Sequence, residues 1–140
     1  MYYHLIKDFF SGDKKLKRIL LCDDHLDVRE SVKLLIEIEF DVEIVEASNG
    51  KEAIDIISQD PLFDLIVSDV HMPIKSGIDV LNCNIRSLKI PQILLSGSAD
   101  DCDVIPEKIN SIKYQFLTKP WDPGELLNTI SSFLEIEKAA

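Results

Sequence analysis

The sequence predicts an α/β fold built on a parallel sheet of five strands. Five short apolar runs alternate with segments whose apolar residues recur at helical spacing, which is the pattern of consecutive βαβ units. The chain has 140 residues, of which 46% are hydrophobic, so it can bury the core of one domain. Polar residues of distinct chemistry end or follow four of the runs, and this placement predicts a functional site at one edge of the sheet.

The five apolar runs are short and separated by turn residues, as strands require. The third run has no alternation of apolar and polar residues in its centre and is predicted to be buried on both faces. The predicted strands cover residues 18–22, 42–46, 64–68, 92–96 and 114–118.

Helical patterns join these strands. Apolar residues across 26–38 recur at three- and four-residue intervals, and Asp24 is available as the N-cap of that helix. Asp122 and Pro123 predict an N-cap followed by proline at the first helical position of the last helix. Two further helices are predicted after the turn at 49–50 and the Pro- and Gly-containing loop at 72–77.

Two segments do not fit the regular pattern. The stretch 99–111 carries Asp100, Asp101, Asp103 and Pro106, which disfavour a long helix, so we expect an irregular loop over 100–105 and a short helix from Pro106. Residues 1–16 are expected to be an N-terminal extension whose apolar spacing suits a short amphipathic helix. That extension is either an arm packed on its own domain or partly disordered, or a docking or dimerisation segment.

Composition excludes several classes of function. The net charge of −10 argues against a nucleic-acid surface, because DNA affinity depends on Lys and Arg that neutralise phosphates. No apolar stretch approaches the ~20 residues of a membrane span. The three cysteines are far apart without a Cys-x-x-Cys pair, so neither a zinc site nor a disulfide framework is predicted. We therefore expect a cytoplasmic protein that binds neither nucleic acid nor membrane.

The candidate site consists of the polar residues at the strand ends. Asp23 and Asp24 follow the first strand, Asp69 follows the third, Ser96 ends the fourth and Lys119 follows the fifth. Three carboxylates suit a hard cation such as Mg²⁺, and Asp69 is then a credible nucleophile toward a phosphoryl group. Lys119 and Ser96 suit contacts to phosphate oxygens. A single strand-end Asp is more often an N-cap, so the prediction depends on all five residues occurring together.

The same residues lie in motifs that resemble the response-regulator receiver domains of two-component signalling. The resemblance covers about 17–137 and implies a doubly wound, flavodoxin-like fold with strand order 2-1-3-4-5. It also implies a receiver domain over 17–140 after the extension. The matching motifs are Leu21–Asp24, Ser68–Pro73 with Gly77, Leu95–Gly97 and Phe116–Pro120.

The resemblance further implies a function. A sensor histidine kinase or histidine phosphotransfer protein would donate a phosphoryl group to Asp69. Magnesium would be held by Asp23, Asp24, Asp69 and the backbone carbonyl of His71. The protein would not be a classical enzyme, because it would catalyse only its own phosphorylation and dephosphorylation.

Output would run through a conformational switch. By the resemblance, Ser96 follows the phosphoryl oxygens, Lys119 pairs with them, and the ring of Phe116 moves inward as Ser96 is drawn to the phosphate. Gly97 leaves room for the phosphate. The switch would act on a downstream effector protein or through a homodimer. A fixed core aromatic is the alternative role for Phe116.

Three other functions remain open. A receiver-like module that acts without phosphorylation would share all of these residues. A phosphohydrolase of the haloacid-dehalogenase type would need an acid two residues after its nucleophile, where His71 stands here. A flavodoxin-like nucleotide or flavin binder would need a Gly-rich loop after the first strand, where the acidic 23–27 segment stands.

Overall fold

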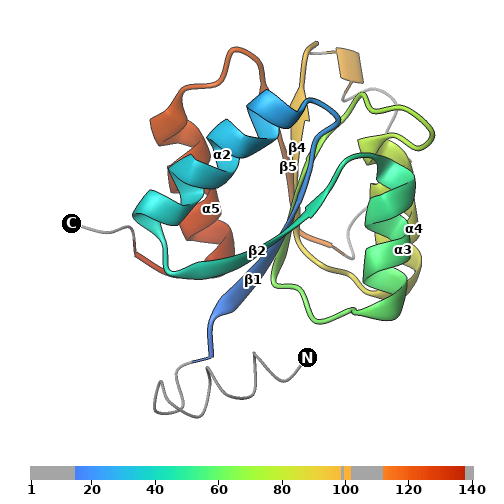
Figure 1. Cartoon of the computed structure of the whole chain (residues 1–140), viewed down its shortest axis with the longest axis horizontal. Coiled ribbons are helices and arrows are strands. Elements are labelled where there is room, and N and C mark those ends of the chain that lie inside the picture. The colour runs from blue at the N-terminus through green and yellow to red at the C-terminus, as the bar shows by residue number, and fades with distance from the viewer. Residues whose placement is uncertain (1–14, 99, 102–111, 138–140) are drawn as a thin grey trace.

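A computed structural model of the chain describes residues 15–98, 100–101 and 112–137. Within these ranges the protein forms one five-stranded parallel sheet of order β2-β1-β3-β4-β5, as expected for the doubly wound fold. Helices α2 and α5 cover one face of the sheet, and α3 and α4 cover the other (Figure 1). Each predicted strand agrees with an observed strand to within one residue at each end. The strands are β1 Lys17–Cys22, β2 Val42–Ala47, β3 Leu65–Asp69, β4 Gln92–Ser96 and β5 Tyr114–Thr118.

Parallel register aligns the carboxyl ends of neighbouring strands. Cys22 on β1 lies opposite Ser68 on β3, so Asp23 and Asp69 follow at the same level. On the other side, Asp69 lies opposite Leu95, and Ser96 lies opposite Thr118. The polar residues after four strands are therefore brought to a single edge of the sheet.

The helices in the described part of the chain are capped in different ways. The Asn49 side chain accepts a hydrogen bond from the Glu52 amide at the start of α3. Ser76 and Asp79 form a reciprocal capping box on α4. None of these helices is long and apolar enough to cross a membrane. The helices are α2 Leu26–Glu39, α3 Gly50–Gln59, α4 Gly77–Ser87 and α5 Pro123–Leu134.

Of the two capping predictions, one is wrong and one is confirmed. The N-cap of α2 is His25 and not Asp24. The Asp23 side chain accepts a hydrogen bond from the His25 amide, and Asp24 lies in the acidic cluster at the sheet edge. The prediction for α5 is confirmed, since Asp122 is its N-cap and Pro123 is its first residue, although the Asp122 side chain makes no capping hydrogen bond. The predicted short helix from Pro106 and most of the extension 1–16 lie outside the described residues.

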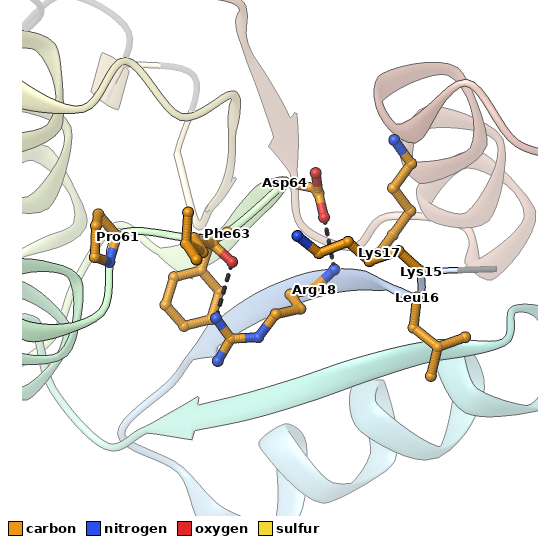
Figure 2. Close-up of a pocket in the computed structure, with 8 residues that line it drawn as sticks. Lys15, Leu16, Lys17, Arg18, Pro61, Phe63 and Asp64 are labelled. Atoms are coloured by element: carbon orange, nitrogen blue, oxygen red, sulfur yellow. Dashed lines mark hydrogen bonds between the residues drawn. The ribbon is translucent and has the colours of Figure 1, made fainter. Parts of the chain in front are cut away.

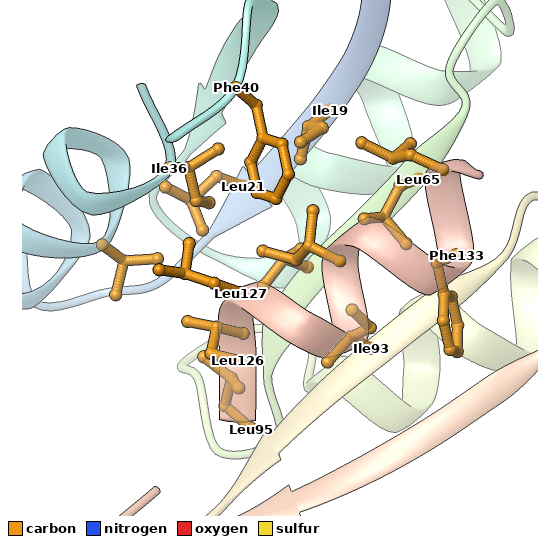
Figure 3. Close-up of a cluster of buried hydrophobic side chains, with 14 of the residues drawn as sticks. Ile19, Leu21, Ile36, Phe40, Leu65, Ile93, Leu95, Leu126, Leu127 and Phe133 are labelled. Carbon is orange, nitrogen blue, oxygen red and sulfur yellow. The ribbon is translucent and has the colours of Figure 1, made fainter. Parts of the chain in front are cut away.

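The core consists of two layers that the sheet separates. Ile19 and Leu21 on β1 face α2 and α5, where they pack with residues such as Ile36 and Leu126 (Figure 3). Leu20 and Cys22 alternate to the opposite face and pack with the apolar side of α3 and α4. This double coverage explains why β3 is buried along its whole length, as predicted.

Gly77, the first residue of α4, holds the helix start against β3. Its amide donates to the Val70 carbonyl at 2.8 Å. A Cβ atom at this position would lie 2.2 Å from the Asp69 carbonyl oxygen. The close approach of the two backbones therefore requires glycine, and it fixes the segment that carries Asp69.

We expect Gly77→Ala to lower the free energy of unfolding by about 2 kcal/mol, measured by urea denaturation. The steric overlap with the Asp69 carbonyl outweighs the ~1 kcal/mol that alanine contributes to helix propensity. Gly124→Ala in the first turn of α5 is the matched control, since its Cβ would meet only the flexible Asp122 carboxylate, at 3.0 Å. Gly124→Ala should leave stability unchanged or raise it, and equal losses in both variants would contradict this explanation.

Candidate functional site

An acidic cluster lies at the carboxyl ends of β1 and β3. Ligand atoms of Asp23, Asp24, His25 and Asp69 all lie within 4.8 Å of one another. The Asp23 amide donates to the Ala47 carbonyl at 3.1 Å, which extends the β1–β2 pairing beyond the strand and fixes the backbone of the first acid. Adjacent carboxylates repel each other, so this arrangement needs compensating positive charge.

Lys119 supplies part of that charge. Its Nζ lies 3.2 Å from Oδ1 of Asp69, and Asp69 is only 5% exposed. The Lys119 amide donates to the Ser96 carbonyl at 2.6 Å, so the backbone that carries the ammonium is bound to the end of β4. Burial raises the pKa of Asp69, and the nearby Lys119 ammonium offsets part of that rise. Asp69 is thus a desolvated carboxyl group beside a positioned cation.

Asp24 shows that the cluster fits a hard cation. Its Oδ1 is buried and has no hydrogen-bond partner in the described residues, although Nδ1 of the largely exposed His25 lies 3.2 Å away. Asp23 uses Oδ1 to accept the His25 amide at 2.9 Å. Carboxylate oxygens are the ligands that Mg²⁺ prefers, so a cluster with an oxygen of this kind fits the ion. Sequence reasoning treated the histidines as scattered, although His25 directly follows the two acids.

Ser96 lies at the end of β4, completely buried, within a polar network. Its Oγ is 2.5 Å from Oδ2 of Asp101 and 2.5 Å from the Ser98 carbonyl oxygen. Oδ1 of Asp101 lies 3.0 Å from Nε2 of His71. The hydrogen bond from Ser96 holds the pKa of Asp101 below its usual range. Sequence reasoning considered Asp101 only as a residue that disfavours a helix, so this contact was missed.

Phe116 lies half-buried in the middle of β5, where it pairs with Leu94 on β4. Its ring is T-shaped to that of Tyr114, with centroids 6.3 Å apart, and it packs against a small cluster that includes Val70 and Leu94. A Cβ built at Gly97 would meet no atom of the described residues within 4 Å. The roles expected for Phe116, Gly97 and the His71 carbonyl remain predictions.

A separate pocket lies at the opposite edge of the sheet, where β1 begins (Figure 2). Arg18 is its central cation, but its guanidinium donates to Asp60, Glu43 and the Leu62 carbonyl. The same group lies 4.4 Å from the centre of the Phe63 ring. Because these contacts already satisfy Arg18, the pocket is explained by packing of the 61–64 loop on β1.

Comparison with known sequences identifies close similarity over most of the chain. The family model of the response regulator receiver domain matches residues 19–131. The transcriptional regulatory protein FlgR of Helicobacter pylori is 31% identical over 127 residues, covering 86% of this chain and 31% of FlgR. The transcriptional regulatory protein CpxR of Escherichia coli K12 is 32% identical over 120 residues, covering 85% of this chain and 50% of CpxR. The chain therefore spans 31% to 50% of the length of these two curated relatives.

Solved structures show the same similarity at the level of the fold. A response regulator receiver domain protein from Clostridium thermocellum has a TM-score of 0.73 and 26% identity, covering 86% of this chain and 95% of that one. The signal receiver domain of an HD domain-containing protein from Pseudomonas fluorescens Pf-5 has a TM-score of 0.74 and 27% identity, with the same coverage. The similarity thus extends over nearly the whole of each of these two structures.

The buried cluster predicts that Asp69→Asn stabilises the protein in metal-free buffer at pH 7, by about 1 kcal/mol. Because burial raises the pKa of Asp69 above its unfolded value, ionisation destabilises the fold as pH rises through that range. A neutral amide removes this cost. Urea denaturation in EDTA measures this change in the free energy of unfolding. Asp41→Asn, at an exposed position, is the control and should change that free energy by less than ~0.5 kcal/mol. A less stable Asp69→Asn protein would show that the carboxylate is favourable in its environment.

Proposed function

The chain belongs to the response-regulator receiver family, and from this premise we propose that it accepts a phosphoryl group on Asp69 from a histidine kinase or a histidine phosphotransfer protein. Receiver domains are signalling modules of two-component systems and not classical enzymes. The observation that carries the proposal is the buried Asp69 carboxyl group, 3.2 Å from the Lys119 ammonium and within an acidic cluster. The family match does not favour the haloacid-dehalogenase alternative.

The proposed reaction uses Asp69 as a nucleophile. A carboxylate oxygen attacks the phosphorus of phosphohistidine, an O–P bond forms, and the electron pair of the broken N–P bond returns to the imidazole. Lys119 neutralises charge on a phosphoryl oxygen, and Ser96 donates a hydrogen bond to another. Burial favours the reaction because it reduces the hydration that a carboxylate loses when it attacks.

The acidic cluster is proposed as a magnesium site. Asp23, Asp24 and Asp69 would hold the ion through carboxylate oxygens, and His71 would add its backbone carbonyl. Bound Mg²⁺ would neutralise charge as the phosphoryl group is transferred. The buried Oδ1 of Asp24 accepts no hydrogen bond in the described residues, and this supports the assignment, because a buried carboxylate oxygen without a hydrogen bond is costly unless a cation binds it.

Signal output is proposed to run through Ser96 and Phe116, which lie on the adjacent strands β4 and β5. Phosphorylation would draw Ser96 toward the phosphate and change the space available to the Phe116 ring. A new position of the ring would alter the surface that a downstream effector or a second copy of the chain recognises. We propose that residues 17–140 form the receiver, with 1–16 as its extension, and that the protein acts in the cytoplasm.

Acetyl phosphate with Mg²⁺ should add one phosphoryl group to the protein, detected by intact-mass measurement. The label should be absent from Asp69→Asn and from a reaction in EDTA. Asp41→Asn is the matched control, because it removes an exposed carboxylate outside the cluster and should retain full labelling. Labelling of Asp69→Asn at the level of the wild type would refute Asp69 as the acceptor.

Magnesium binding should change the fluorescence of Trp121, the single tryptophan, which lies two residues beyond Lys119. Asp24→Ala should weaken the measured affinity by at least about tenfold, because it removes one proposed oxygen ligand. Asp41→Ala should bind like the wild type. Equal affinities in all three proteins would exclude Asp24 from the metal site.

A further inference from the structure

The Ser96 hydroxyl, which the proposed function assigns to a phosphoryl oxygen, already has a negatively charged partner. Oδ2 of Asp101 lies 2.5 Å from Ser96 Oγ. The hydroxyl has one hydrogen, and the Ser98 carbonyl oxygen is equally close. Of these two acceptors, the ionised carboxylate forms the stronger hydrogen bond. The hydroxyl hydrogen is therefore directed to Asp101.

Asp101 is itself held in place by several contacts. Its amide donates to the Ser98 carbonyl at 3.2 Å, and its other carboxylate oxygen lies 3.0 Å from Nε2 of His71. The residue is only 9% exposed, so water competes little for its side chain. Contacts on both carboxylate oxygens orient the group toward Ser96. Asp101 thus joins the end of β4 to the loop that follows Asp69.

We propose that Asp101 is a positioning residue that retains the Ser96 hydroxyl in the unphosphorylated conformation. The proposal rests on Asp69 phosphorylation, because an aspartyl phosphate and Asp101 would compete for the same hydroxyl hydrogen. Activation then requires the Ser96–Asp101 hydrogen bond to break. The cost of breaking this bond lowers the population of the active conformation. The affinity for a phosphoryl analogue, which binds that conformation, falls by the same factor as the population.

Beryllofluoride, a phosphoryl analogue, tests the proposal in the full 140-residue chain with saturating Mg²⁺, and calorimetry gives its affinity. Asp101→Ala should bind about tenfold more tightly than the wild type, the size expected when a charge-assisted hydrogen bond no longer opposes the active state. Asp100→Ala is the matched control, since it removes an adjacent, exposed carboxylate with the same charge. An unchanged affinity in Asp101→Ala, or an equal gain in Asp100→Ala, would overturn the proposal.

A double-mutant cycle determines whether Asp101 acts through Ser96. In a Ser96→Ala background, Asp101→Ala should change the affinity for beryllofluoride by less than about twofold. A full tenfold gain in that background would mean that Asp101 acts by charge repulsion alone, and the positioning role would be wrong. Asp101→Leu also removes the acceptor and fills more of the space, and it replaces Asp101→Ala in the cycle if the alanine variant does not melt cooperatively.

Amide exchange in the free protein tests the contact independently of phosphoryl chemistry. The Ser98 amide donates to Ser96 Oγ at 3.1 Å, so it should exchange faster by NMR when Asp101→Ala releases the hydroxyl. Asp100→Ala should leave its exchange unchanged. Failure of the wild type to bind beryllofluoride would refute the proposed function alone, whereas unaltered Ser98 exchange in Asp101→Ala would refute the role of Asp101.

Discussion

Parallel pairing of β1, β3, β4 and β5 brings the carboxyl ends of four strands to one edge of the sheet, and every group of the candidate site depends on that alignment. The register of Cys22 with Ser68 places Asp23 level with Asp69. On the far side, the hydrogen bond from the Lys119 amide to the Ser96 carbonyl fixes the end of β5 against β4. A slip of one residue would turn each of these side chains to the opposite face.

This alignment has an electrostatic cost that the rest of the fold offsets. Two nearly buried carboxyl groups, Asp23 and Asp69, lie close together, and the described cation in contact with Asp69 is Lys119. The apolar layers on both faces of the sheet supply the favourable free energy, and the Gly77 contact keeps the Asp69 backbone from relaxing away. The site is therefore a locally unfavourable arrangement that a stable scaffold maintains, as is common for functional groups.

Sequence patterns were sufficient to predict the positions of the strands, because apolar runs bounded by turns leave few alternative strand boundaries. Capping was less predictable. Asp23 and Asp24 are chemically equivalent neighbours, and sequence alone does not show which of the two accepts the hydrogen bond from the His25 amide. Asp101 was missed for a related reason: its carboxylate meets Ser96 only in the folded chain, where the Asp101 amide donates to the Ser98 carbonyl beside the end of β4.

The sequence by itself determined the α/β class, the positions of the five strands and the residue types at the sheet edge. These features are local, since apolar periodicity and strand-end polarity are determined within a few residues. Tertiary structure decided which polar atoms meet: the 3.2 Å contact of Lys119 with Asp69, the unpaired oxygen of Asp24, and the hydrogen bond of Ser96 to Asp101. Those contacts join residues from different strands and loops, so their geometry exists only after the strands have paired and the helices have packed on both faces.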